Sequence, residues 1–314
     1  MERDEELMTR VAWAYYNEEL TQAEIASRLG LTRARVNRML QECRESGLVQ
    51  ILINSETAGC VALERRLERR YGLVKAVVVP TPARENKLYA AIGMAAGMYV
   101  SESLRDGQSL GLGWGKTLRA AARGIRQRPA GDLAIVSLFG GLPHSATTNP
   151  YDVASVFART LSAAECYFIA APMYVSSEEV REVLMSQTMF DEVFERAAEV
   201  DMALVGAGDL TSRSTNVVLG ALTRDEWRSL LDVGAAGEIF GYFLDGEGNL
   251  VDHPLNNRFM GGDFGRLRNI PCKVVASGGA HKAGILRAVL EGGYANVFIT
   301  DELAAKAVLD QEGT

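Results

Sequence analysis

The segment TQAEIASRLGLTRARVNRMLQECRESG, residues 21–47, contains two helix-start signals separated by a glycine. Thr21 and Glu24 have the spacing of a capping box, in which a hydroxyl and a carboxylate each bond a backbone amide at the first turn of a helix. Gly30 suits a tight turn because glycine adopts positive φ at little steric cost. Thr32 is a residue type that caps a second helix. The spacing therefore predicts two short helices joined by a turn.

The second predicted helix has two unlike faces. Its apolar residues share one side at helical spacing, and these are Val36, Met39, Leu40 and Cys43. The other side carries arginine and asparagine, which read guanine and adenine in the major groove of DNA. We therefore predict a helix-turn-helix with the following DNA-contacting residues: Gln22, Thr32, Arg33, Arg35, Asn37 and Arg38. The alternative is a helical hairpin whose basic face is only solvated.

The flanking residues extend this motif at both ends. A first helix is predicted before it, with one apolar side that would complete a three-helix core: Leu7, Val11, Ala14 and Tyr15. Gly47 has the residue type that ends a helix. The run Leu48–Ile53 favours β-structure and predicts a short wing. Residues 1–54 are accordingly interpreted as a winged helix-turn-helix domain that binds operator DNA.

The composition limits the class of protein. The chain has 314 residues, 47% of them hydrophobic, and a net charge of −7, and this length fits about two domains. An acidic chain with a local basic face suits a regulator that binds one DNA site and does not coat DNA generally. Its four cysteines and three histidines are scattered without ligand spacing, so we expect free thiols, no metal and no cofactor. We also expect a cytoplasmic location, because neither a signal pattern nor an apolar run of about 18 residues is present.

Residues 55–72 are predicted to connect two domains. After a polar break at Ser55–Gly59, a helical stripe of apolar residues follows between charged flanks: Cys60, Leu63, Leu67 and Tyr71. The stripe can pair with a partner chain, or it can pack on the second domain of its own chain. Both interpretations stay open at this point.

Residues 73–314 alternate apolar strands with amphipathic helices. The predicted strands are Lys75–Pro80, Ser109–Gly113, Leu133–Gly141, Cys166–Pro172, Met202–Gly208, Lys273–Gly279 and Val297–Thr300, and the helices between them include Lys87–Leu104, Lys116–Arg126, Asp152–Leu161 and His281–Glu291. Continuous apolar strands separated by helices indicate an α/β fold with a doubly wound, mostly parallel sheet. Glu238–Pro254 differs, because two short strands there surround an Asp-Gly-Glu-Gly-Asn turn and predict a hairpin insertion.

Ligands of open α/β sheets collect at the carboxyl ends of the strands. One such end has the sequence GLGWGKT, and its candidate ligand-binding residues are Gly113, Trp114, Gly115, Lys116 and Thr117. Glycines there let backbone amides approach an anion, and the start of the following helix favours negative charge. An ordinary strand-to-helix turn is the alternative interpretation.

Other strand ends add candidate residues. These are Gly141, His144 and Asn149 after one strand, Asp209 after another, Glu238 and Asp245 in the hairpin region, and Lys282 after the double glycine at 278–279. A lysine in the first turn of a helix is disfavoured by the helix dipole, and a bound anion would compensate for it. Lys282 is therefore the strongest single candidate among them.

The order of these motifs resembles the SorC family of bacterial sugar-responsive transcriptional regulators. The similarity extends over nearly the whole chain and is most specific in SGGAHKAGILRAVLEGGYANVFITDELA, residues 277–304. It implies an effector domain similar to glucosamine-6-phosphate deaminase and ribose-5-phosphate isomerase, a phosphorylated sugar or related effector, and a tetramer. It also implies phosphate binding by Trp114–Thr117 and Lys282. Some members have an arginine where this chain has Phe139, a departure that favours a monophosphate or a neutral polyol, as in erythritol-type regulators.

Three functions fit these observations. The first is a transcriptional regulator, a repressor of a sugar or polyol catabolic operon, that binds operator DNA and a small-molecule effector as a homo-oligomer and contacts no membrane. The second is a sugar-phosphate isomerase or deaminase with an appended DNA-binding domain, but no compact catalytic motif is visible. The third is an architectural DNA-binding protein. Of these three functions we expect the first, and we do not expect an enzyme.

Overall fold

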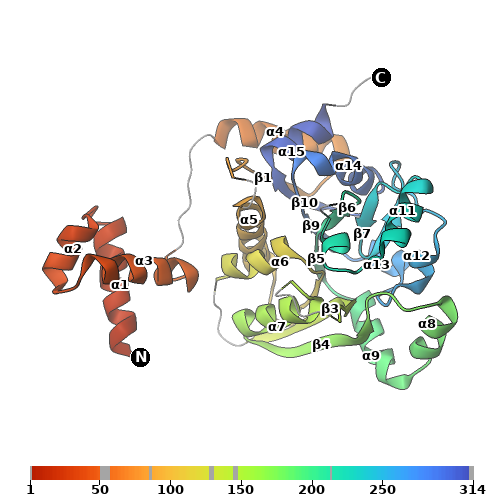
Figure 1. Ribbon diagram of the computed structural model, residues 1–314, viewed down its shortest axis with the longest axis horizontal. Coiled ribbons are helices and arrows are strands. Elements are labelled where there is room, and N and C mark those ends of the chain that lie inside the picture. Colours follow the sequence, from red (N-terminus) through yellow and green to blue (C-terminus); the bar gives the residue numbers. More distant parts are fainter. Residues whose placement is uncertain are drawn as a thin grey trace. The chain divides into compact units, whose positions relative to one another are not determined.

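A computed structural model describes residues 2–49, 57–84, 87–126, 131–143, 148–212 and 214–310. The chain divides into two compact units, residues 1–55 and 56–314 (Figure 1). Each unit has hydrophobic clusters of its own, and the two are described separately below.

The first unit is a three-helix domain built from α1 (Glu2–Tyr16), α2 (Gln22–Leu29) and α3 (Arg33–Glu45). Its core joins Val11 of α1, Ile25 of α2 and Val36 and Leu40 of α3. The apolar stripes predicted for the first helix and for the recognition helix both face this core. Helical spacing thus placed the buried side of each helix correctly.

The ends of these helices follow the predicted caps. The Thr21 hydroxyl accepts from the amide of Glu24, and the Glu24 carboxylate accepts from the amide of Thr21 at 2.8 Å. Gly30 has φ +64° in the turn, and the Thr32 hydroxyl accepts from the amide of Arg35. The helix-turn-helix is therefore confirmed. Of the predicted wing, Leu48 and Val49 form no strand, and residues 50–53 lie outside the described residues.

The second unit contains a parallel sheet with the strand order β1-β10-β9-β5-β2-β3-β4. The strands are β1 (Lys75–Val79), β2 (Ser109–Leu112), β3 (Gly131–Gly141), β4 (Ala163–Pro172), β5 (Met202–Val205), β9 (Cys272–Ala276) and β10 (Val297–Asp301). Each coincides with a predicted strand to within a few residues. Only the carboxyl end of the predicted strand Met202–Gly208 forms a separate element.

Helices cover both faces of this sheet. One face is packed by α5 (Leu88–Ser103), α6 (Lys116–Ala121), the 3-10 helix η2 (Ala122–Gly124) and α7 (Pro150–Leu161). The opposite face is packed chiefly by α4 (Thr57–Tyr71), α9 (Thr188–Ala198), α14 (Ala283–Glu291) and α15 (Glu302–Leu309). Neighbouring residues of one strand face different cores, as Val274 and Val275 do in β9. This is the predicted doubly wound arrangement (Figure 1).

The apolar stripe of α4 packs within its own unit. Cys60, Leu63 and Leu67 are buried in the same cluster as Val308 and Leu309 of α15. Of the two interpretations left open by the sequence, packing on the chain's own second domain is therefore the one that the structure shows.

The hairpin prediction was wrong in its details. The structure has a separate antiparallel sheet of β6 (Ala207–Asp209), β7 (Gly237–Ile239) and β8 (Tyr242–Leu244). The tight turn joins β7 to β8 at Phe240 and Gly241, whose φ angles are +54° and +81°. The predicted Asp245–Asn249 turn follows β8 and closes only a single bridge, Leu244 to Leu250. A turn-like sequence therefore did not identify the turn that sets the strand register.

Shorter helices fill the remaining connections. These are α8 (Glu178–Met185), α10 (Thr215–Val218), α11 (Arg224–Asp232), α12 (Pro254–Arg258), α13 (Phe264–Arg268) and the 3-10 helix η3 (Ala280–Lys282). No helix in the described ranges is both long enough and apolar enough to cross a lipid bilayer.

Candidate functional site

The first candidate site is the exposed face of α3. Thr32, Arg33, Asn37 and Arg38 are exposed there, opposite the buried Val36. Because Thr32 caps the helix, its first turns are held in place while their arginines face outward. The arrangement is chemically suited to phosphate and base edges in a major groove.

Gln22 and Arg35 complete this surface. The Gln22 side-chain amide lies 3.4 Å from the Asn37 side-chain oxygen, so α2 contacts the reading face of α3. Arg35 is exposed one turn before Arg38, whose guanidinium lies 3.7 Å from the Glu42 carboxylate. All six residues predicted to contact DNA thus lie on or beside one face, and their individual roles stay predictions.

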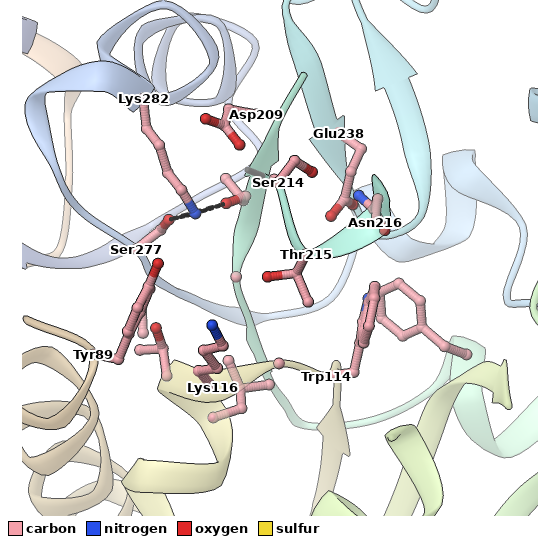
Figure 2. Close-up of a pocket in the computed structure, with 18 residues that line it drawn as sticks. Tyr89, Trp114, Lys116, Asp209, Ser214, Thr215, Asn216, Glu238, Ser277 and Lys282 are labelled. Carbon is pink, nitrogen blue, oxygen red and sulfur yellow. Dashed lines mark hydrogen bonds between the residues drawn. The ribbon is translucent and has the colours of Figure 1, made fainter. Parts of the chain in front are cut away.

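The second candidate site is a pocket at the carboxyl ends of β2, β5 and β9 (Figure 2). It includes seven of the residues predicted to bind an effector: Trp114, Gly115, Lys116, Thr117, Asp209, Glu238 and Lys282. These residues lie in the turn between β2 and α6, in α6, in β6 and β7, and at the end of η3, so segments far apart in sequence meet here. The position agrees with the general rule for ligand sites of open parallel sheets.

Lys282 marks the inner side of the pocket. Its ammonium group donates to the carbonyl of Ala207 at 2.8 Å and lies 3.4 Å from the Ser277 hydroxyl (Figure 2). Burial lowers the pKa of Lys282, and the nearby carboxylates of Asp209 and Glu238 oppose this change. The structure thus places a half-buried cation among fixed oxygens.

Glu238 lies beside this cation on β7. It is 6% exposed, and its carboxylate accepts from the amide of Gly241 at 3.1 Å. Burial raises the pKa of Glu238 to about 7, although Gly241, Lys282 and the Asn216 side chain favour its charged form. A carboxyl group that titrates near neutral pH can both donate and accept hydrogen bonds toward a ligand hydroxyl.

Asp209 and His281 form a third polar group at the pocket. The His281 ring nitrogen lies 3.6 Å from the Asp209 carboxylate, which also accepts from the Thr211 hydroxyl at 2.9 Å. Asp209 is buried, whereas a third of the His281 side chain is exposed. His281 does not line the pocket itself.

The glycine-rich loop forms the other side. Gly115 has φ +107°, which suits glycine, and it precedes α6. Its amide donates to the carbonyl of Thr148 at 3.1 Å, so this amide is already used within the protein. Lys116 is exposed, and its ammonium lies 5.4 Å from the centre of the Tyr89 ring. The loop therefore offers a solvated cation rather than the amide nest expected from its glycines.

Four predicted effector residues lie away from this pocket and have structural roles. The amide of Gly113 bonds the carbonyl of Leu204 in the sheet, and Gly141 leaves room for the Tyr151 ring. Asn149 caps α7 and donates to the carbonyl of Leu142 at 2.9 Å. Asp245 accepts from amides of its own turn. A fifth candidate, His144, lies outside the described residues.

Sequence reasoning missed several polar residues of the pocket: Tyr89, Ser214, Thr215, Asn216 and Ser277. Ser277 directly follows β9, so its position at a strand end was an available signal. Ser214–Asn216 follow an irregular loop, and no pattern indicates that they return to the pocket. The Ser214 hydroxyl is buried and has no hydrogen-bond partner in the described part of the chain.

Phe139 also lines the pocket. It is 2% exposed and packs edge-on against Phe259, with ring centres 5.5 Å apart. This wall of the pocket is therefore apolar. Among the described residues, no group of histidine, cysteine and carboxylate side chains could hold a metal ion.

Comparison with known protein families separates the same two regions. Residues 55–310 match the family described as "Putative sugar-binding domain". Residues 7–64 match the Crp-like helix-turn-helix domain. The helix-turn-helix and the α/β unit thus each have a counterpart among known domain families.

The chain is also similar to regulators along its full length. It is 33% identical to the transcriptional regulator LsrR of Enterobacter sp. strain 638, over 99% of this chain and 94% of that protein. It is 30% identical to the erythritol catabolism regulatory protein EryD of Brucella abortus strain 2308, over 98% of both. The crystal structure of the full-length sorbitol operon regulator SorC from Klebsiella pneumoniae matches with a TM-score of 0.77 and 26% identity, covering 97% of this chain and 98% of that one. The chain belongs to the SorC family of sugar-binding transcriptional regulators.

Proposed function

We propose that this regulator is a repressor of a carbohydrate or polyol catabolic operon and that an effector in the β2/β5/β9 pocket releases it from operator DNA. Residues 1–54 read the operator, residues 73–314 bind the effector, and residues 55–72 connect the two. The protein works in the cytoplasm, where its operator lies. The names of EryD and SorC, which refer to erythritol catabolism and a sorbitol operon, support the polyol class.

The observation that carries this proposal is the unsatisfied polar chemistry of the pocket. The buried Ser214 hydroxyl lacks a partner among the described residues, and Ser214 lines the pocket together with Glu238 and Asn216. A buried hydroxyl without a hydrogen bond is costly, and a ligand hydroxyl would satisfy it. This supports a polyhydroxylated effector.

The two lysines of the pocket support a negatively charged group on the same effector. Lys282 is fixed at the inner side, and Lys116 stands at the opposite, solvent-facing side. A phosphate between them would gain two charge-assisted contacts. Phe139 of β3 lines the pocket and is apolar, so this wall of the pocket carries no third cation. We infer one phosphate at most, and a neutral polyol is the other effector class to test.

A thermal-shift screen of the purified protein tests this proposal. The compounds are tetritol, pentose and hexose phosphates, together with the matching free polyols. An effector at about 100 times its dissociation constant should raise the free energy of unfolding by about 2.7 kcal/mol. A hit should also release the protein from operator DNA. If no compound of these classes stabilises the protein, the proposed effector class is wrong.

The DNA-reading role is tested on Arg35 and Arg38. The double variant Arg35→Ala/Arg38→Ala should weaken operator binding by about 1–3 kcal/mol for each base contact that is lost. Circular dichroism must show an unchanged helix content, since both side chains are exposed. A folded double variant that binds operator as tightly as wild type would refute the assignment of α3 as the reading helix.

The proposed assembly is a homo-oligomer, a tetramer built from dimers. One helix-turn-helix offers few base contacts, and a two-fold pair doubles them over half-sites separated by whole turns of DNA. Light scattering with and without operator measures this state. A stable monomer under both conditions would contradict it.

An enzyme is the second candidate function, because one pocket holds Glu238, whose pKa is about 7, next to Lys282, whose pKa burial lowers. Such a pair is suited to proton transfer at neutral pH. Purified protein that isomerises or deaminates sugar phosphates, with the activity lost in Glu238→Gln, would establish this function. Binding without turnover would support the regulator and exclude the enzyme.

A further inference from the structure

We infer that the outward face of α4 binds the DNA backbone, so that the second unit contributes a phosphate-contacting surface separate from the helix-turn-helix. The surface consists of Arg65, Arg66 and Arg69, and we call it the α4 basic face. The inference rests on the DNA-binding function of the chain. It adds a contact outside residues 1–54, which were assigned to DNA reading.

Charge is separated around α4. The helix carries Glu64 and Glu68 next to its arginines in sequence, but both carboxylates turn toward the sheet. Glu64 accepts from the amide of Val78 at 2.9 Å, and Glu68 accepts from the amide of Ala76 at 3.0 Å. Both acids thereby satisfy the free edge of β1, so neither neutralises the arginines on the other side.

The arginines of α4 lie on the side of the helix that faces solvent. The buried side of α4 is defined by Cys60, Leu63 and Leu67. Arg65, Arg66 and Arg69 are exposed, and their side chains form no ion pair or hydrogen bond with any described residue. Arg65 and Arg69 are four residues apart and Arg66 and Arg69 three, so all three lie on adjacent turns of one surface.

The charge of the α4 basic face indicates its partner. Three guanidinium groups without intervening acids on a chain of net charge −7 indicate an anionic partner. DNA is the polyanion that this chain binds, and arginine pairs with phosphate through two parallel hydrogen bonds. The DNA-binding unit ends at Ser55 and α4 begins at Thr57, so the two basic surfaces belong to consecutive parts of one chain.

The test uses the full-length protein and a long duplex that carries an operator selected from a random library by the wild type. The variant is Arg65→Gln/Arg66→Gln/Arg69→Gln. The matched control is Arg123→Gln/Arg159→Gln/Arg224→Gln, which removes the same charge from exposed positions elsewhere in the second unit. A third protein, Arg65→Lys/Arg66→Lys/Arg69→Lys, keeps the charge of the face. Binding is measured between about 50 and 200 mM salt.

The glutamine variant should show a weaker salt dependence. Each lost phosphate contact lowers the slope of log affinity against log salt by about 0.9, or about 2.7 for each bound protomer when all three contact DNA. The control triple and the lysine triple should keep the slope of the wild type. The preferred operator sequence should not change in any variant, because phosphate contacts carry no base specificity.

Three outcomes would overturn the inference. An unchanged slope in the glutamine variant would show that the face is solvated. An equal loss in the control triple would show that only net charge matters. A change in molecular mass by light scattering would assign the arginines to a contact between copies of the chain. Wild-type protein that binds no duplex would instead refute the DNA-binding function itself.

Discussion

Lys116 and Lys282 both follow glycine-rich strand ends, yet they have different surroundings in the pocket. Lys282 donates to the carbonyl of Ala207 and lies near the carboxylates of Asp209 and Glu238. Lys116 is exposed above the Tyr89 ring and makes no hydrogen bond within the described residues. Both lysines line the pocket, but Lys282 is also bonded within the folded structure, whereas Lys116 is solvated. We therefore expect a substitution of Lys282 to change chiefly the stability of the protein, and a substitution of Lys116 to change chiefly effector binding.

The largest effect is expected from removing the fixed cation. In Lys282→Met, the buried Glu238 and Asp209 lose their positive neighbour, and unpaired buried charge is strongly destabilising. We expect a loss of about 3 kcal/mol in the free energy of unfolding at pH 8. Lys116→Met is the matched control and should change it by less than about 0.5 kcal/mol. Urea unfolding of both variants measures this, and equal losses would remove the distinction between the two lysines.

The next effect concerns the charge of Glu238. Burial raises its pKa to about 7 from an ordinary value of 4.5, so the folded protein holds this proton more tightly than the unfolded chain. This contribution to stability is complete below pH 4.5 and is lost as the pH rises through 7. Glu238→Gln has no such loss. Its stability relative to wild type should therefore increase by up to about 3 kcal/mol between pH 4.5 and pH 8.

Urea unfolding at these two pH values checks the sign of the Glu238 effect. Glu247→Gln, at an exposed position in the turn after β8, serves as the control and should show little change with pH. If the relative stability of Glu238→Gln stays constant over this range, the carboxyl group is not held protonated by burial.

A smaller effect is expected from the solvent-facing cation. Lys116→Met should weaken a phosphorylated effector by about 1.5 kcal/mol, roughly tenfold, the low end for a charge-assisted hydrogen bond because the lysine is solvated. Affinity for the matching free polyol should stay the same. Isothermal titration with the pair of compounds from the screen measures both. Equal weakening of the two compounds would mean that Lys116 does not face the phosphate.

The smallest effect is expected for His281, which lies beside Asp209 but does not line the pocket. His281→Gln removes a contact of 3.6 Å with Asp209 that is partly exposed to water. Partly exposed ion pairs contribute little, so stability should change by no more than about 0.5 kcal/mol. Asp209 also keeps its bond from the Thr211 hydroxyl. A loss comparable to that of Lys282→Met would show that His281 contributes as much as Lys282 to holding the buried carboxylates.

The first unit could be predicted from the sequence in more detail than the second, for a physical reason. The helix caps and the turn of the first unit depend on contacts over three or four residues, so they can be predicted directly from the sequence. The residues that form them are Thr21, Glu24, Gly30 and Thr32. In the second unit, the strands were legible because parallel strands buried on both faces are continuously apolar. The order of the strands could not be predicted, since it depends on long-range pairing. It places β10 beside β1 and β5 beside β2.

The pocket shows the same limit at the level of single residues. Strand ends correctly indicated Trp114, Lys116, Asp209 and Lys282 as neighbours, because the carboxyl ends of parallel strands meet at one edge. Asn149 was misjudged because the same side chain that could bind a hydroxyl also caps α7. A polar side chain shows its bonding capacity in sequence, but not the partner that uses this capacity.

The helix-turn-helix, the α/β class and the strand ends that meet at the pocket could all be predicted from sequence, because they depend on local periodicity and capping. Three other facts came from the folded chain alone: Lys282 is held by Ala207, Glu238 is buried beside it, and the Ser214 hydroxyl lacks a partner within the described ranges. Those facts depend on desolvation and on contacts between distant segments. Neither is set until the sheet and its helices pack together.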